Sequence, residues 1–148
     1  MSKDTLIIIK PDALSMGLAG KIIAELEKEE LKLCGARLVQ LTKERAKEFY
    51  REHSNKDFYG PLVDFMSVNP IFVMVWAGEN VIKRSRKIIG DTDPRDAKEG
   101  TIRKKWAQDY RHNIIHGSDS PSSAAREIEF FFPSGRGIYR WKKKEFKL

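Results

Sequence analysis

Two kinds of apolar spacing divide the chain into strand-like and helix-like segments. Residues 5–10 are β-branched and apolar until Pro11-Asp12 interrupts them, which indicates a buried strand with Lys10 at its mouth. Residues 33–41 and the run from Ile71 to Trp76 have the same strand-like character. The sequence therefore predicts buried strands over these three segments.

Apolar residues three and four positions apart predict amphipathic helices between and after these strands. Thr42 is a suitable N-cap for one helix, and Ser120-Pro121 gives another a hydroxyl cap followed by proline at its first position. Phe58 to Pro61 interrupts the pattern ahead of a short helix. The apolar faces contain Ile22, Ile23 and Leu26; Ala46, Phe49 and Tyr50; residues 62–66; Val81, Ile82, Ser85, Ile88 and Ile89; and Ala124, Ile128 and Phe131.

Strands and helices thus alternate along the chain, which predicts an α/β (α+β) sandwich with a mostly antiparallel sheet covered by helices. The 148 residues suffice for a single domain over residues 1–148. With 41% hydrophobic and 33% charged residues, the composition is typical of a globular protein rather than a disordered chain. Gly90 to Gly100 is too long for a simple connection and is a candidate functional loop.

Several classes of protein and site are disfavoured by the sequence. The longest apolar runs are far shorter than the roughly 20 residues that span a bilayer, and we expect neither a membrane partner nor a secretory signal. Cys34 is the only cysteine, which excludes an internal disulfide and fits a reducing cytoplasm, the location we expect. Residues 17–21 lack the spacing of a P-loop, and His112 and His116 lack the further ligands of a zinc site.

The net charge of +7 is concentrated at the C-terminus. Residues 134–148 carry six basic side chains against one acidic side chain, Glu145, and the rest of the chain is nearly balanced. A basic tail of this kind is usually a solvated terminus and less often a surface for polyanions or acidic partners. A nucleic-acid-binding or regulatory protein therefore stays open as the alternative to an enzyme, although it is not favoured.

One histidine lies in a setting that packing alone does not explain. His116 follows Ile114-Ile115, which resembles the end of a buried strand, and Gly117 then permits a tight bend beside three small polar residues at positions 118–120. An imidazole with one unprotonated ring nitrogen can act as nucleophile or general base near neutral pH. A lone histidine at a strand end is more often structural, but the polar surroundings of His116 favour a catalytic role.

Four residues elsewhere in the chain have side chains that commonly bind phosphate: Lys10, Arg86, Thr92 and Arg103. Taken singly, each is more often a surface charge or a loop hydroxyl. Their joint occurrence with the histidine segment indicates a phosphate site. Seven short motifs support this interpretation: Ile9-Lys10-Pro11-Asp12, Phe49-Tyr50, Phe58-Tyr59, Met74-Val75-Trp76, Ile89-Gly90-Asp91-Thr92-Asp93-Pro94, Gly100-Thr101-Ile102-Arg103, and Asn113 through Ser120.

In this order the motifs closely resemble the nucleoside diphosphate kinase family, from about Asp4 to Phe132. The resemblance implies a ferredoxin-like βαββαβ core. It also implies transfer of the γ-phosphate of a nucleoside triphosphate, typically ATP, to a nucleoside diphosphate, which maintains the NTP and dNTP pools. His116 matches the residue that carries the phosphate as a phosphohistidine, so the implied reaction is ping-pong.

The same resemblance implies roles for further residues. Tyr50, Ser118 and Glu127 match residues that support the histidine, with Glu127 orienting the imidazole directly or through Ser118. Lys10 matches a lysine that contacts phosphate and ribose, and we count it among the catalytic residues. The implied nucleotide contacts are Arg86, Thr92 and Arg103 for phosphate, Asn113 for the sugar 3′-hydroxyl, and Phe58, with Leu62 beside it, for the base.

The resemblance implies Mg²⁺ as cofactor, carried by the nucleotide phosphates rather than by protein ligands. It further implies ATP and other nucleoside tri- and diphosphates as substrates, and a homo-oligomer, for which we favour a hexamer over a tetramer. Two segments depart from the family pattern, namely Lys104-Lys105-Trp106 and Tyr110-Arg111-His112. We expect these departures to alter the flank of the nucleotide site or a subunit contact.

Overall fold

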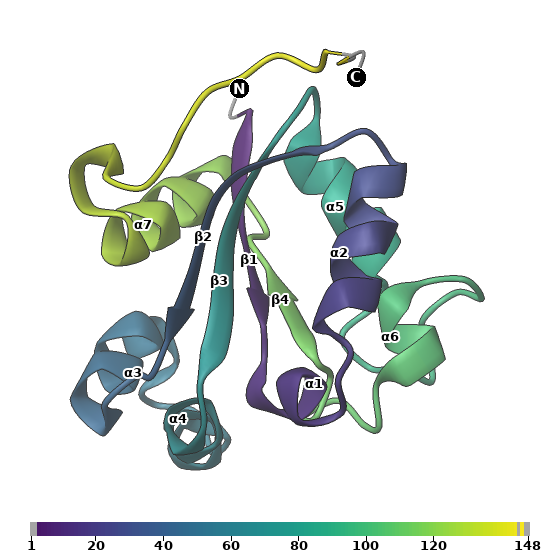
Figure 1. Ribbon diagram of the computed structural model, residues 1–148. Coiled ribbons are helices and arrows are strands. Elements are labelled where there is room, and N and C mark those ends of the chain that lie inside the picture. The colour runs from purple at the N-terminus through teal and green to yellow at the C-terminus, as the bar shows by residue number, and fades with distance from the viewer. Residues whose placement is uncertain (1–2, 145, 147–148) are drawn as a thin grey trace.

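The computed structural model describes residues 3–144 and 146, and its strands form a four-stranded sheet in the order β2-β3-β1-β4 (Figure 1). The strands are β1 (Asp4–Ile9), β2 (Lys32–Val39), β3 (Ile71–Ala77) and β4 (Ile115–Gly117). The helices are α1 (Pro11–Ser15), α2 (Ala19–Lys28), α3 (Lys43–Phe49), α4 (Tyr59–Val68), α5 (Val81–Ile89), α6 (Ile102–Trp106) and α7 (Pro121–Phe131), with short 3-10 helices η1 (Arg51–His53) and η2 (Pro133–Gly135).

The strand pairings produce the topology that the family resemblance implied. β1 pairs antiparallel with both β3 and β4, and β2 pairs antiparallel with β3. β3 therefore lies between β1 and β2. The chain passes from β1 through α2 to β2, and then returns through α3 and α4 to form β3 between them. A second crossover through α5 brings β4 to the other side of β1. This is the expected βαββαβ core with an antiparallel sheet, and the predicted fold class is confirmed.

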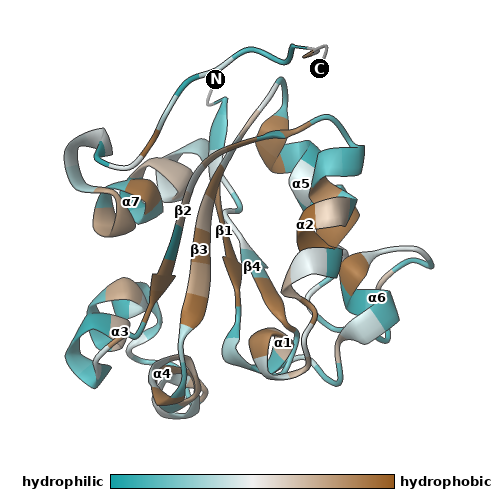
Figure 2. Ribbon diagram, viewed as in Figure 1, coloured by the Kyte–Doolittle hydropathy of each residue, from teal (hydrophilic) through white to brown (hydrophobic). Residues whose placement is uncertain are grey.

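The core lies on both faces of the sheet because residues 6–9 of β1 are apolar and contact the two helix layers alternately. Leu6 and Ile8 pack with side chains of α3, α4 and α7, whereas Ile7 and Ile9 pack with side chains of α1, α2, α5 and α6. All four side chains are fully buried. The continuous apolar run in β1 is the pattern of a strand covered on both faces, and Figure 2 shows hydrophobic residues along the central strands.

Two predicted helix boundaries differ from the structure, and proline explains both. Pro11-Asp12 was expected to form a turn, but Pro11 is the first residue of α1. α4 begins at Tyr59, so Pro61 lies within its first turn instead of ahead of the helix. The first turn of a helix has no intrahelical acceptors for its N–H groups, and proline therefore costs no hydrogen bond there. The short helix α6 was not predicted.

The predicted tight bend at Gly117 was wrong. Gly117 lies within β4, and the left-handed backbone conformation is found at Ile114, with φ of 63°. A Cβ atom built on Gly117 would lie 2.7 Å from Ile89 Cδ1. A larger residue at this position would require the end of the Ile89 side chain on α5 to shift, and His116 is part of the strand rather than a residue beyond its end.

Strand β2 differs slightly from the predicted range of residues 33–41. It contains a register shift between Leu33 and Gly35 and ends at Val39. The chain then turns into α3, whose N-cap Thr42 accepts a hydrogen bond from the Arg45 N–H at 3.1 Å, as its sequence position suggested. None of the helices in the described residues is long and apolar enough to cross a membrane.

The described part of the basic C-terminal tail passes the start of β2 and crosses the end of the sheet near the start of β1 (Figure 1). The Tyr139 N–H donates to the Cys34 carbonyl at 2.8 Å, and Trp141 Nε1 donates to the Leu33 carbonyl at 2.9 Å. Arg140 forms two hydrogen bonds of 2.7 Å with the Asp4 carboxylate. Backbone groups at this part of the sheet edge thus have partners from the tail.

Candidate active site

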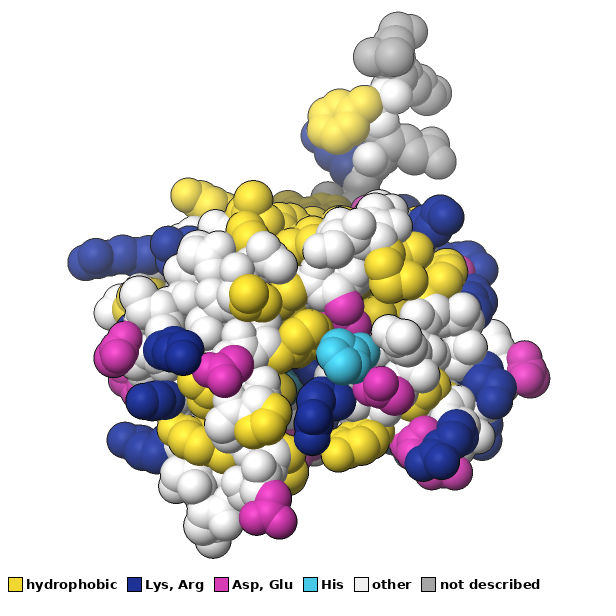
Figure 3. All heavy atoms as spheres, turned by 90° about the horizontal axis from the view of Figure 1, so that it is seen from below, with side chains coloured by type: hydrophobic (Ala, Val, Ile, Leu, Met, Phe, Trp, Pro, Cys, Tyr) yellow, Lys and Arg dark blue, Asp and Glu magenta, His cyan; other side chains and the backbone are white. Residues whose placement is uncertain are grey.

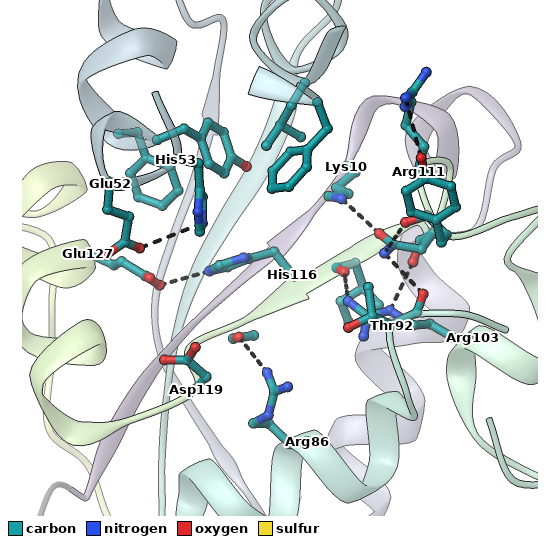
Figure 4. Close-up of a pocket in the computed structure, with 18 residues that line it drawn as sticks. Lys10, Glu52, His53, Arg86, Thr92, Arg103, Arg111, His116, Asp119 and Glu127 are labelled. Carbon is teal, nitrogen blue, oxygen red and sulfur yellow. Dashed lines mark hydrogen bonds and ion pairs between the residues drawn. The ribbon is translucent and has the colours of Figure 1, made fainter. Parts of the chain in front are cut away.

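A cavity of about 330 Å³ opens beside the carboxyl end of β1 and gathers most of the candidate residues (Figure 4). Its walls come from α3, η1, the start of α4, α5, the loop before α6, and β4. Around this side of the molecule, apolar, basic and acidic side chains are interleaved at the surface (Figure 3). The candidate residues that line the cavity are Lys10, Tyr50, Phe58, Leu62, Arg86, Thr92, Arg103, Asn113, His116 and Glu127.

His116 is presented to the cavity by β4, where it pairs with Ile8. Its Nε2 lies 2.8 Å from Glu127 Oε1, and the Ser118 hydroxyl donates to the same oxygen at 2.8 Å. Because a carboxylate only accepts hydrogen bonds, this contact places the imidazole proton on Nε2. None of the hydrogen bonds of the described residues uses Nδ1, so that nitrogen keeps its lone pair.

Glu127 and Ser118 form the support behind the imidazole. Both are buried, Glu127 on α7 and Ser118 directly after β4. The Ser118 Oγ also accepts a hydrogen bond from the Leu6 N–H at 3.2 Å, which fixes the hydroxyl to β1. The edge of the Phe49 ring approaches the imidazole at a centroid distance of 5.9 Å. Strand, helix and aromatic contact together restrict the orientation of His116.

Tyr50 supplies a buried hydroxyl at the same cavity. Burial, followed by the negative charge of Glu127, raises the pKa of Tyr50, so the phenol stays protonated. Within the described residues its oxygen has no hydrogen-bond partner. A buried polar group without a partner is unusual in folded proteins, and this one belongs to a side chain that lines the cavity.

Lys10 and Asn113 meet at the end of β1. Lys10 Nζ donates to Asn113 Oδ1 at 2.7 Å, and the Asn113 amide nitrogen donates to the carbonyls of Tyr110 at 2.8 Å and Thr92 at 3.3 Å. Burial and the positive charge of Arg103 lower the pKa of Lys10 to about 8. The Asn113 side chain thus links the lysine to the two loops beside the cavity.

Arg103 is held by backbone carbonyls alone. It donates to Ile115 at 2.7 Å, to Gly90 at 3.0 Å and to Asn113 at 3.4 Å. Burial, followed by the positive charge of Arg86, lowers the pKa of Arg103 to about 10. Asp91 offsets only part of this effect, and the hydrogen-bond acceptors of Arg103 are neutral, so an anionic ligand would add a favourable charge.

Arg86 projects from α5 towards β4 and donates to the Gly117 carbonyl at 3.1 Å. Together with Lys10 and Arg103 it directs three cationic groups towards the cavity that His116 enters. Thr92 lines the cavity from the loop that follows α5. The arrangement suits a ligand with several phosphate groups, because each cation can contact a different phosphoryl oxygen.

The residues of the cavity fit a metal ion only as part of a phosphate complex. Among the described residues, no group of three or more His, Cys, Asp or Glu side chains is arranged to hold a metal ion. Asp119 is a carboxylate at the cavity surface. Hydrogen bonds lower its pKa, and the bond from the Ser123 side chain has the largest effect. Mg²⁺ prefers oxygen ligands and commonly combines one or two carboxylates with substrate phosphates.

Sequence reasoning did not identify two lining residues, Glu52 and His53. The His53 ring lies beside Phe58 at a centroid distance of 5.5 Å, and Glu52 pairs with Arg126 of α7 at 3.2 Å. Both are in the non-periodic segment after α3, where no spacing signal marks them. The motif residue Tyr50, close by in sequence, was the only indication that this segment borders the site.

Comparison with known proteins agrees with the fold and the cavity. The family model for nucleoside diphosphate kinase matches residues 3–136. A nucleoside diphosphate kinase of Halalkalibacterium halodurans is 49% identical over 130 residues, 88% of each chain. Another, from Anaeromyxobacter sp., is 47% identical over 140 residues, 94% of this chain and 95% of its own.

Solved structures of nucleoside diphosphate kinases superpose closely on this chain. The Aquifex aeolicus enzyme has a TM-score of 0.88 and 42% identity, with 92% of this chain and 98% of that chain covered. The Halobacterium salinarum enzyme, solved in complex with CDP, has a TM-score of 0.92 and 37% identity, with coverage of 97% and 95%. The chain belongs to the nucleoside diphosphate kinase family, and it is an enzyme that transfers phosphate between nucleotides.

Proposed function

We propose that His116 carries the transferred phosphate as a phosphohistidine in a ping-pong reaction. The observation that supports this most directly is the 2.8 Å contact between His116 Nε2 and Glu127, which leaves the Nδ1 lone pair available. Nδ1 attacks the γ-phosphorus of the nucleoside triphosphate, and the bond from that phosphorus to the bridging oxygen breaks. The nucleoside diphosphate leaves with the electron pair.

In the second half of the reaction, a terminal phosphate oxygen of another nucleoside diphosphate attacks the same phosphorus. The N–P bond breaks, and the electron pair returns to Nδ1. Glu127 accepts a hydrogen bond from the Nε2–H group throughout and stabilises the positive charge that develops on the imidazole. One site thereby serves donor and acceptor in turn, without two polyanions bound at the same time.

The cations around His116 would bind and stabilise the phosphates. Arg86, Arg103 and Lys10 offset charge on phosphoryl oxygens, which is the main catalytic contribution in phosphoryl transfer. Thr92 adds a hydroxyl to these contacts, and Tyr50 adds its unpaired phenol. Mg²⁺, carried mainly by the nucleotide, would neutralise part of the phosphate charge.

The nucleoside would occupy the rest of the cavity. Asn113 lies between Lys10 and the outer residues, which suits a contact to the sugar 3′-hydroxyl. Phe58 and Leu62 at the start of α4 offer an apolar surface to the base. Stacking on such a surface tolerates any base, so we expect a broad range of nucleotide substrates.

Transfer of labelled phosphate tests the proposed mechanism. Wild-type protein incubated with γ-labelled ATP and Mg²⁺ should form an acid-labile phosphoenzyme that passes its label to GDP, and His116→Ala should form none. Peptide mapping and ³¹P NMR of the phosphoenzyme should assign the phosphate to Nδ1 of His116. Label retained by His116→Ala, or phosphate on Nε2, would contradict the mechanism.

We further propose that this single-domain chain, with its basic tail at 134–148, forms a homo-oligomer, a hexamer rather than a tetramer. Leu38 and Val68 support self-association because they are large apolar side chains, 67% and 63% exposed, that an interface would cover. Sedimentation equilibrium distinguishes the two assemblies by mass. The free, buried thiol of Cys34 fits the reducing cytoplasm as its location.

A further inference from the structure

Glu127 lies between two concave regions of the protein, and only one of them has a role in the proposed function. Besides the cavity that His116 enters, a groove of about 650 Å³ lies between α3, η1 and α7, and Glu127 lines both. Glu127 Oε1 accepts hydrogen bonds from His116 and Ser118. Among the hydrogen bonds of the described residues, none involves Oε2. The carboxylate is thus held by hydrogen bonds through one oxygen only.

Arg126 brings a positive charge to the second oxygen. Its Nη2 lies 4.0 Å from Glu127 Oε2. Arg126 lines the groove, whereas the cavity walls in the described part of the chain do not include it. The two residues are neighbours on α7, and side chains at neighbouring helical positions point about 100° apart and do not face each other. A further contact is therefore needed to direct the guanidinium towards Glu127.

Glu52 supplies this contact from η1. Its Oε1 lies 3.2 Å from the same Arg126 nitrogen, Nη2. Figure 4 shows Glu52 and Glu127 together on one side of His116. The guanidinium thus lies between two carboxylates that come from different elements, and the pair with Glu52 keeps it on the side of Glu127 Oε2.

A charge at this position can orient the carboxylate of Glu127. The Glu127 side chain is only 8% exposed, so water screens its interaction with Arg126 less than it screens a pair at the surface. The Arg126 side chain is 44% exposed, which keeps the attraction modest. Rotation of the carboxylate would take Oε2 away from Arg126 and Oε1 away from His116 and Ser118. Arg126 therefore favours the orientation that places the imidazole proton on Nε2.

We propose that Arg126, held by Glu52, is a positioning residue for phosphate transfer: it fixes the carboxylate of Glu127 and thereby keeps the His116 proton on Nε2. The inference rests on the proposed function, because that function requires the lone pair of His116 Nδ1 to attack phosphorus. Since Arg126 acts from outside the cavity, it should affect the rate of transfer and leave nucleotide affinity unchanged.

Single-turnover kinetics separate these two effects. We expect Arg126→Met to lower the rate of phosphoenzyme formation about fivefold, with the Kd for ADP unchanged. Arg126→Lys keeps the charge and should recover at least half of the rate. Arg45→Met is the matched control, because Arg45 lines the same groove, is 48% exposed and pairs with Glu48 at 3.0 Å. A loss below about twofold in Arg126→Met, or an equal loss in Arg45→Met, would overturn the inference.

Double variants test whether Arg126 acts through Glu127. In protein that already carries Glu127→Gln, Arg126→Met should change the rate by less than about twofold, because the charge that it orients is gone. A full fivefold loss in that background would overturn the inference. Glu52→Gln should slow wild-type protein about twofold and have no effect beside Arg126→Met. An additional loss there would overturn the part assigned to Glu52.

The tautomer of His116 provides a readout that needs no catalysis. The ring nitrogen shifts of His116 in ¹⁵N NMR of the free enzyme should report protonation at Nε2, and Arg126→Met should add a population protonated at Nδ1. The chain has three histidines, so the spectrum of His116→Ala assigns the signals. An unchanged tautomer in Arg126→Met would overturn the inference.

Failure of the inference is separable from failure of the proposed function. If the phosphoenzyme forms normally and Arg126→Met matches the wild type in rate and tautomer, only the role of Arg126 is wrong. If wild-type protein forms no phosphoenzyme while Arg126→Met still shifts the His116 tautomer, the phosphohistidine mechanism is wrong and the control of the tautomer by Arg126 stands.

Discussion

The inner and outer ends of the cavity are built on opposite principles. At the inner end, Lys10, Arg103 and Asn113 are 7%, 5% and 3% exposed, and their partners are carbonyl and amide groups without charge. At the outer end, Phe58 and Tyr110 are aromatic and partly exposed, with few polar contacts. The inner end is thus preorganised to bind negative charge. The outer end offers aromatic surface that is exposed to water in the free protein.

This difference indicates that the inner end should contribute most of the free energy of nucleotide binding. Burial, followed by the positive charge of a neighbouring arginine, lowers the pKa of Lys10 and Arg103 and opposes folding of the free protein, although Asp12 and Asp91 offset part of this effect. A phosphate ligand supplies the missing charge, so the unfavourable arrangement becomes favourable on binding. The outer end carries no such cost, and its contribution should be smaller and less sensitive to geometry.

Replacement of Arg103 should have the largest effect. We expect Arg103→Met to lower kcat/KM about 1,000-fold, because it removes a buried cation directed at the transferred phosphate. Lys105→Met, two residues further along α6 and paired with Glu25 at the surface, is the control and should stay near wild type. A loss below about tenfold in Arg103→Met would show that the inner cations are not the main source of catalysis.

Glu127→Gln should lower kcat about 100-fold, because an amide no longer requires the imidazole proton to be on Nε2. The KM for nucleotides should change little, since Glu127 contacts His116 and Ser118. Single-turnover formation of the phosphoenzyme measures the step directly. Glu129→Gln, on the same helix but exposed, serves as control; equal losses in both variants would contradict the assigned role.

Lys10 should make the stability of the free protein depend on pH. The pKa of Lys10 is about 8 in the folded protein and 10.5 in its ordinary range. As pH rises, Lys10 therefore loses its proton in the folded state before it does so in the unfolded state. Stability should therefore increase from about pH 8 to 10.5 and be lost as pH falls through 8, by at most about 3 kcal/mol.

Thermal unfolding of wild type and Lys10→Met across this range measures the effect. At pH 7 the variant should be the more stable protein although it binds nucleotide poorly, and the difference should shrink towards pH 10.5. A variant that is less stable at every pH would mean that the bond to Asn113 outweighs the cost of the buried charge.

Phe58→Ala should have the smallest effect of these changes. Loss of one stacking surface should raise the KM for nucleoside diphosphates about fivefold. Because the base is remote from the transferred phosphate, kcat should stay within about twofold. Steady-state kinetics with ADP and CDP measure both values. A fall in kcat as large as that of Glu127→Gln would remove the distinction between the two ends of the cavity.

The sequence predicted the elements that form the sheet and most of the residues that the cavity brings together. Strand-like runs such as residues 5–10 are recognisable because burial on both faces demands apolar side chains throughout. His116, Lys10 and Arg103 were found because they occur within short motifs of a known family. Their catalytic and binding roles stay predictions until the variants are measured.

Features that depend on distant contacts were missed or misread. Gly117 was taken for a bend, but it lies within β4 and packs closely on Ile89 of α5, 28 residues earlier in the sequence. Glu52 and His53 have no local pattern that marks them. The tail was expected to be solvated, whereas Tyr139 and Trp141 bond to the edge of β2, a strand more than 100 residues away.

By itself the sequence determined the order of strands and helices, the family and the chemical types available for phosphate transfer. Those properties depend on local spacing and on short motifs. The tertiary structure alone decided the hydrogen-bond geometry of His116 and the lowered pKa of Lys10. It also brought Phe58 and Tyr110 to one cavity, because each of these features depends on burial and on contacts between segments far apart in the chain.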